Sequence, residues 1–122
     1  MGGFFRQMFV PGELTREQEN RIAREVVIPG RLPERDVALA ALEILATADL
    51  REMLPVVDRP VLLIHGEADT ICLPGASRYM SEQLPQAKLV KLSGVGHAPF
   101  LSRPEEFNGI LSGFLEALHG RH

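Results

Sequence analysis

The chain has 122 residues, of which 45% are hydrophobic and 24% are charged, and its formal net charge is −3. Thirteen basic against sixteen acidic side chains give no electrostatic reason to expect nucleic acid as a partner. Every aliphatic run, such as residues 61–64, is far shorter than the ~20 apolar residues of a membrane span. A single cysteine excludes an internal disulfide and a cysteine-based zinc site. We therefore expect a cytoplasmic globular chain that binds neither membrane nor nucleic acid.

The first half of the chain predicts helices. A capping box that starts at Thr15 predicts a helix from there to about residue 27. Pro33 is typical of a first helical turn and predicts a second helix over about 34–46, with an apolar stripe at helical spacing. A short third helix is expected over 50–54, capped by an aspartate.

The second half predicts alternating strands and helices. A continuous apolar run at 60–65 indicates a strand buried on both faces, and 87–92 indicates a second strand. A helix over 74–84 separates them, and a capping box at Ser102 opens a final helix. The order strand, helix, strand, helix predicts a crossover unit with parallel strands.

A sheet of only two parallel strands is physically unfavourable by itself. Both of its edges are open, and parallel sheets occur almost only as buried parts of larger folds. We therefore expect this sequence to form one end of a larger sheet. The remaining strands would come from a missing N-terminal half or from other copies of the chain in a homo-oligomer.

Two loops that follow the predicted strands carry the candidate chemistry. Asp69 lies in the loop after the first strand, and His97 lies in a glycine-rich loop after the second. Ligands of open parallel sheets bind outside the carboxyl ends of the strands, so both loops fall at the expected position. Neighbouring strands would bring the two side chains together although 97 − 69 = 28 positions separate them.

A carboxylate next to an imidazole is a proton-handling pair. The carboxylate fixes the ring tautomer and stabilises the imidazolium, while the other ring nitrogen acts as a base. Each residue taken singly has an ordinary interpretation as a turn residue. Their occurrence together, in the order Asp then His, matches the chain order of α/β-hydrolases.

The two segments also resemble the α/β-hydrolase superfamily. Residues 60–69 (PVLLIHGEAD) are similar to the strand that delivers the catalytic acid. Residues 96–100 (GHAPF), followed by PEEF at 104–107, are similar to the loop that delivers the catalytic histidine. Within this superfamily, the chain most resembles the lid and C-terminal portion of the pimeloyl-[acyl-carrier protein] methyl ester carboxylesterases of biotin synthesis. The segments that indicate this family within the superfamily are 32–37, 42–45 and 49–51.

This resemblance implies the C-terminal portion of an α/β-hydrolase, with 1–54 as a helical lid and 55–122 as part of the core. It implies serine-type hydrolysis of a carboxylic ester, an acyl methyl ester that is free or bound to acyl-carrier protein. His97 would be the general base and then the acid, oriented by Asp69, with no metal or organic cofactor. It also implies that Phe5, Met8 and Phe9 contact the acyl chain. Packing of these side chains in the core is an equal alternative.

The sequence departs from the family at the nucleophile. The family serine lies in a Gly-x-Ser-x-Gly elbow, and none of the serines has that frame: Ser77, Ser81, Ser93, Ser102 and Ser112. We therefore expect the chain to be inactive alone and to need a nucleophile half. Two alternatives stay open: a non-catalytic remnant or assembly module, and an α/β-hydrolase with another substrate, such as a general esterase or a carbon–carbon bond hydrolase.

Overall fold

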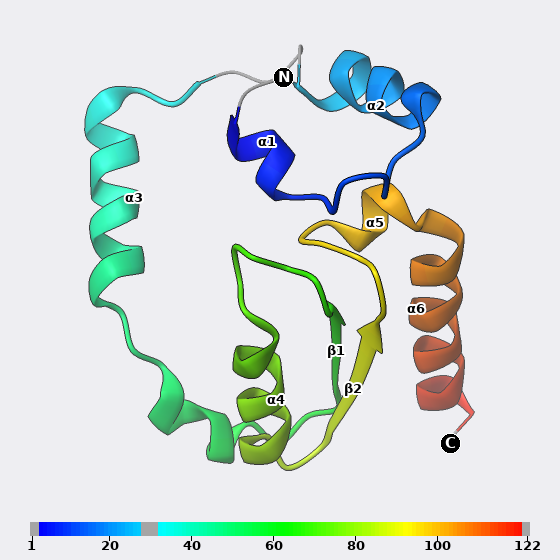
Figure 1. Ribbon diagram of the computed structural model, residues 1–122. Helices are drawn as coiled ribbons and strands as arrows, with labels where there is room; N and C mark the ends of the chain where they lie inside the picture. The colour runs from blue at the N-terminus through cyan, green and yellow to red at the C-terminus, as the bar shows by residue number, and fades with distance from the viewer. Residues whose placement is uncertain (1–2, 28–31, 121–122) are drawn as a thin grey trace.

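A computed structural model describes residues 3–27 and 32–120 (Figure 1). The helical first part comprises α1 (Gly3–Gln7), α2 (Arg16–Ile22), a π-helical turn (Ala23–Val27), α3 (Arg35–Thr47) and a 3₁₀ helix (Arg51–Val56). The second part comprises β1 (Val61–Gly66), α4 (Pro74–Gln83), β2 (Ala87–Leu92), α5 (Pro99–Ser102) and α6 (Pro104–His119). Short α1 and α5 were not predicted.

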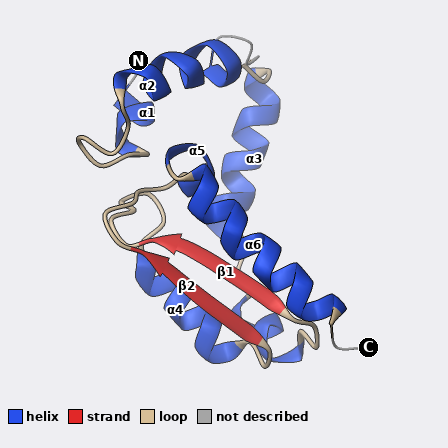
Figure 2. Cartoon of the chain, turned by 90° about the vertical axis from the view of Figure 1, so that its right-hand side faces the viewer, coloured by secondary structure: helices blue, strands red, loops and turns tan. Residues whose placement is uncertain are grey.

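The described strands form one two-stranded parallel sheet. Val61 lies opposite Ala87 and Gly66 lies opposite Leu92, so the two strands end together. α4 connects the strands and contacts both, and α6 lies on the other face of the sheet (Figure 2). The predicted crossover unit is therefore confirmed. The prediction that 60–65 is buried on both faces is wrong, because residues 61–65 are only half-buried in a sheet of two described strands.

One predicted capping box is confirmed and the other is wrong. The Thr15 hydroxyl accepts from the Gln18 amide at 3.1 Å, and the Gln18 side chain accepts from the Thr15 amide at 2.9 Å. Ser102, in contrast, ends α5, and its buried hydroxyl donates to the Ala98 carbonyl at 3.5 Å. It is therefore inside a helical turn and does not cap α6, which begins after Arg103.

Most of the small core lies where the strands end, with the buried apolar side chains Leu92, Val95 and Ala98. Leu84, also buried, lies at the end of α4. The apolar stripe of α3, in contrast, is not part of this core. Leu42 is 60% exposed and Leu45 is 79% exposed. Figure 1 shows why, because α3 lies beside the rest of the chain, away from the sheet.

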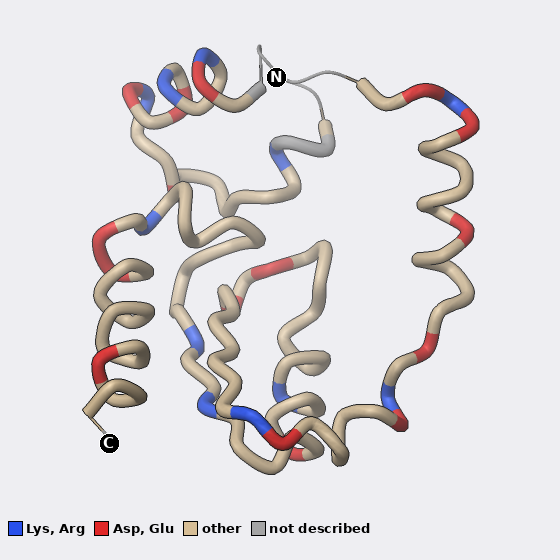
Figure 3. The backbone as a smooth tube through the Cα atoms, turned by 180° about the vertical axis from the view of Figure 1, so that it is seen from behind, with Lys and Arg blue, Asp and Glu red and all other residues tan. Residues whose placement is uncertain are grey.

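Charges of both signs lie along α2. Basic and acidic side chains alternate along α2 (Figure 3), where Arg21 and Glu17 form an exposed ion pair at 3.9 Å. Such exposed pairs contribute little to stability. Within the described ranges, none of the helices has the length and apolar character needed to span a bilayer.

Candidate functional site

The loops after β1 and β2 are joined by backbone hydrogen bonds. The Glu67 amide donates to the Leu92 carbonyl at 2.9 Å, and the Ala68 amide donates to the Val95 carbonyl at 3.0 Å. Gly66 lies against the second loop so closely that a β-carbon on it would overlap the carbonyls of residues 95 and 96. Because the two strands end at the same register position, the loops leave the sheet side by side.

A buried anchor and a tight turn set the position of the second loop. Gly94 has φ +72°, a backbone conformation that L side chains rarely adopt, so the chain turns sharply just after β2. Val95 is 1% exposed and fastens the loop into the core. The next side chain but one, His97, is thereby presented at the rim with 31% of its surface exposed.

The structure brings Asp69 and His97 into direct contact. The His97 Nδ1 atom lies 3.0 Å from Asp69 Oδ2. A carboxylate only accepts hydrogen bonds, so the imidazole carries its proton on Nδ1 and leaves Nε2 as a proton acceptor. This is the tautomer that a general base oriented by a carboxylate requires.

The environment of Asp69 favours its ionised form. Burial of the side chain, which is 4% exposed, opposes ionisation. The hydrogen bond from the Cys72 amide (3.0 Å), the bond from His97 and the bond from the Ile71 amide (2.9 Å) outweigh it, so the pKa of Asp69 is lowered. The carboxylate is therefore a fixed acceptor whose negative charge faces the imidazole.

A second histidine lies beside the same carboxylate. His65 Nε2 is 2.7 Å from the Cys72 carbonyl and 3.3 Å from Asp69 Oδ2. A carbonyl only accepts, so His65 carries a proton on Nε2 and directs it toward the acid loop. The sequence motifs assign His65 no role at the site. Its position four residues before Asp69, at the end of the strand, was the signal that the acid loop folds back onto it.

The pair opens into a small cavity. The cavity has a volume of about 210 Å³, and its lining includes His65, Asp69, Cys72 and His97. Among the described residues, no group of three or more His, Cys, Asp or Glu side chains could hold a metal ion. With Nε2 as an acceptor, the His97 imidazole can take up and release a proton at this site.

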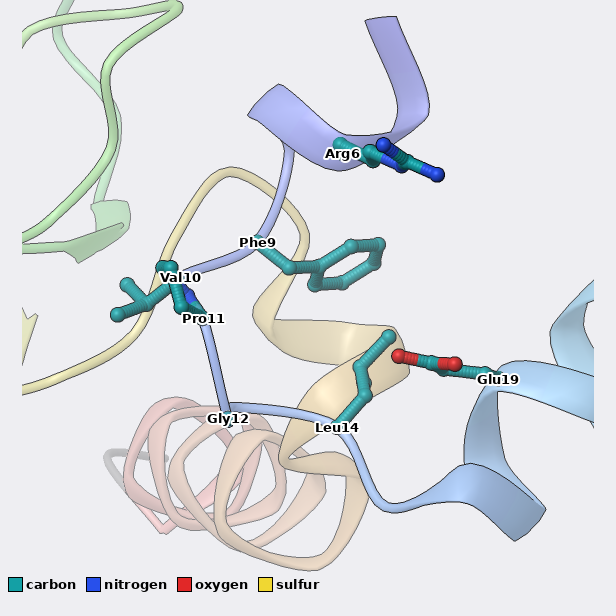
Figure 4. Close-up of a pocket in the computed structure, with 7 residues that line it drawn as sticks. All are labelled: Arg6, Phe9, Val10, Pro11, Gly12, Leu14 and Glu19. Atoms are coloured by element: carbon teal, nitrogen blue, oxygen red, sulfur yellow. The ribbon is translucent and has the colours of Figure 1, made fainter. Parts of the chain in front are cut away.

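Phe9 lines a different cavity, shown in Figure 4. This cavity has a volume of about 310 Å³ and lies between α1, the segment 9–14 and the start of α2, and the side chains of Phe9, Leu14 and Glu19 extend toward it. Met8 is half-buried, and its backbone carbonyl accepts from the His97 amide at 2.6 Å. The side chain of Phe5 lies outside the part of the chain that the structure describes.

None of the serines forms the missing nucleophile elbow. Ser77, the nearest to a Gly-x-Ser-x-Gly frame, is buried in α4, where its hydroxyl donates to the Pro74 carbonyl at 3.0 Å. A hydroxyl held inside a regular helix lacks the exposed strand-to-helix turn that such a nucleophile needs.

Comparison with known sequences identifies relatives of this chain. The sequence profile of the α/β-hydrolase fold family matches residues 4–104. The chain is 48% identical over 84 residues to a pimeloyl-[acyl-carrier protein] methyl ester esterase of Nitrosomonas europaea. The match covers 69% of this chain and 33% of the relative. It is 31% identical over 105 residues to the esterase of the same name from Yersinia pseudotuberculosis, which is 86% of this chain and 41% of the relative.

Comparison with solved structures gives the same fold. An α/β-hydrolase enzyme from a sediment metagenome of the Mar Chica lagoon, Morocco, superposes with a TM-score of 0.62 at 27% identity. The match covers 67% of this chain and 39% of the solved one. The chain thus spans between a third and about two-fifths of the length of these relatives.

Proposed function

The chain belongs to the α/β-hydrolase fold family, and from this premise we propose that it supplies the acid and histidine of a serine-type carboxylic ester hydrolase. The observation that carries the proposal is the 3.0 Å hydrogen bond between His97 Nδ1 and Asp69 Oδ2. It joins two loops at the carboxyl ends of neighbouring parallel strands. The names of the relatives, both esterases, support ester hydrolysis over other reactions of this fold.

In each half of the proposed reaction, His97 accepts one proton and then donates it. Its Nε2 takes the proton of a serine hydroxyl as the serine oxygen attacks the ester carbonyl, and then gives that proton to the departing alcohol. Water next attacks the acyl-serine by the same route, so one ester and one water yield one acid and one alcohol. Asp69, held ionised by its amide donors, stabilises the imidazolium formed in each half of the cycle.

The nucleophile in this scheme belongs to another part of the hydrolase fold. The sequence contains no Gly-x-Ser-x-Gly frame, so the chain alone lacks the atom that forms the acyl-enzyme. We assign residues 55–122 to the core and residues 1–54 to the lid. The exposed apolar stripe of α3 and the open edges of the two-stranded sheet support a partner half or a second copy of the chain as the missing cover.

The proposed substrate is an acyl methyl ester, such as the methyl ester of a pimeloyl group on acyl-carrier protein. The support is the name of the relatives at 48% and 31% identity. Phe5, Met8 and Phe9 are proposed to contact the acyl chain. Of these three, Phe9 lines the 310 Å³ cavity, which is large enough for a short acyl chain.

Complementation with a nucleophile half tests the function. The chain is co-expressed with the N-terminal part of the Nitrosomonas europaea relative, and hydrolysis of a short p-nitrophenyl ester is measured with and without that part. We expect turnover only in the complemented protein, and we expect His97→Ala to lower it at least ~100-fold. His119→Ala, at the exposed end of α6, is the matched control and should retain full activity.

Two outcomes would reject the proposal or its assignments. A folded complex that hydrolyses no ester would favour the non-catalytic module. An active complex that is insensitive to His97→Ala would show that the base lies elsewhere. Comparing the p-nitrophenyl ester with an acyl methyl ester bound to acyl-carrier protein then separates the proposed substrate from that of a general esterase.

A further inference from the structure

The loop that carries His97 is tied to the N-terminal segment 8–13 as well as to the acid loop. The His97 amide donates to the Met8 carbonyl at 2.6 Å, and the Gly96 amide donates to Glu13 Oε1 at 2.9 Å. A β-carbon on Gly96 would overlap the Met8 carbonyl, so the two backbones are in direct contact. Two successive amides of the histidine loop are therefore held by one short segment distant in sequence.

Glu13 is a buried carboxylate, which is rare for an acidic residue. It is 6% exposed, and its Oε1 atom accepts from the Val10 amide at 2.8 Å as well as from Gly96. Its Oε2 atom is buried and has no hydrogen-bond partner among the described residues. The Arg103 guanidinium donates to the main-chain carbonyl of Glu13 at 2.9 Å, not to the carboxylate.

The burial of Glu13 has an energetic cost that an apolar side chain in the same place would not have. Burial of a carboxylate is unfavourable, and hydrogen bonds have to compensate for it. An apolar side chain would fill the same volume without that cost, but it would leave the amides of Val10 and Gly96 without their acceptor. What Glu13 adds is therefore one oxygen at a fixed place between two backbone segments.

We propose that Glu13 is a positioning residue for His97. By holding the Gly96 amide, it fixes the backbone one residue before His97, and so sets the distance between His97 Nδ1 and Asp69. The inference deepens the proposed function, and its kinetic part rests on that function. Its structural part, the tautomer and position of the His97 ring, is independent of any reaction.

Three substitutions at Glu13 test whether its acceptor oxygen or its negative charge positions His97. Glu13→Gln removes the charge but keeps a carbonyl oxygen at the position of Oε1. Glu13→Asp keeps the charge, but its carboxylate is one methylene too short to reach both amides. Glu13→Ala removes the acceptor. Glu25→Ala, at an exposed glutamate of the π-helical turn, is the matched control.

The first readout is the tautomer of His97 in the full 122-residue chain. Two-bond nitrogen–proton correlation spectra of chain labelled with nitrogen-15 histidine report which ring nitrogen carries the proton, and the His97 signal is assigned with His97→Gln. We expect the Nδ1–H form in the unmodified chain, Glu13→Gln and Glu25→Ala. In Glu13→Asp and Glu13→Ala we expect a mixture with the Nε2–H form. Urea denaturation identifies any variant that has not folded; if Glu13→Ala fails, the contrast between Gln and Asp decides.

The second readout is the kinetics of the complemented protein. We expect Glu13→Asp and Glu13→Ala to lower kcat about 100-fold, as misplacement of a reacting group by about 1 Å does, with KM little changed. Glu13→Gln should retain most of kcat. A folded Glu13→Asp variant with the unmodified tautomer and kcat would overturn the inference. A complex that is inactive in every variant, but shows the expected tautomer changes, would refute the proposed function and leave the positioning role supported.

Discussion

Asp69→Asn changes the Asp69–His97 pair with almost no change in shape. The amide oxygen of the asparagine can still accept from the amides of Ile71 and Cys72, which lie 2.9 and 3.0 Å from Oδ1. The NH₂ group then takes the place of Oδ2 and donates toward His97. The imidazole must accept at Nδ1, so its proton moves to Nε2 and the ring is in the wrong tautomer to act as a base.

The expected loss of kcat in Asp69→Asn follows from this change of the His97 tautomer. An equivalent tautomer error in a serine protease lowers kcat about 10⁴-fold, which corresponds to about 5 kcal/mol of transition-state stabilisation. Stability should fall by only about 1–3 kcal/mol, because the bonds from the Ile71 and Cys72 amides lose their charge but keep an acceptor. Asp36→Asn, at an exposed carboxylate in the first turn of α3, should change neither quantity appreciably.

The acid limb of the stability curve gives an independent check. The pKa of Asp69 is lowered in the folded chain, so its ionisation stabilises the fold at pH values above the unfolded pKa of about 3.9. That contribution is lost as the pH falls through the folded-state pKa. Urea denaturation as a function of pH should show a weaker acid dependence for Asp69→Asn.

If the complemented Asp69→Asn enzyme retained more than about a tenth of its rate, the assignment of the pair would be refuted.

Two further predictions concern the framework of the site. Gly66→Ala should lower the free energy of unfolding by about 1–3 kcal/mol in urea denaturation, because its β-carbon would overlap the carbonyls of the histidine loop. Gly75→Ala, where a β-carbon meets nothing within 4 Å, is the matched control, and equal effects would disprove the packing argument. Light scattering should find the isolated chain to be oligomeric or partly unfolded, and glutamate at Leu42 and Leu45, both exposed on α3, should increase the monomer fraction. A stable monomer of the unmodified chain with a cooperative melt would contradict this prediction.

Local patterns in the sequence predicted most of the regular elements. The capping box at Thr15, the proline before α3 and the apolar runs of β1 and β2 each act over a few residues, so they can be identified without tertiary information. The short helix α5 begins with a proline too, but its four residues are too few to show an apolar periodicity. The π-helical winding after α2 has no local pattern that would predict it. Ser102 shows the limit of such patterns: its sequence fits a cap, but the turn that begins at Pro99 takes it into α5.

The sequence by itself determined which side chains can form a proton-handling pair. Asp69 and His97 each follow a strand, and parallel neighbouring strands place their following loops at one edge of the sheet. The tertiary structure alone decided what surrounds that pair. The bond from Gly96 to Glu13 and the contact of His65 with the acid loop depend on where the loops fold in three dimensions. Hydrogen bonds between distant segments leave no periodicity in the sequence, whereas helices and strands repeat their contacts at fixed spacing.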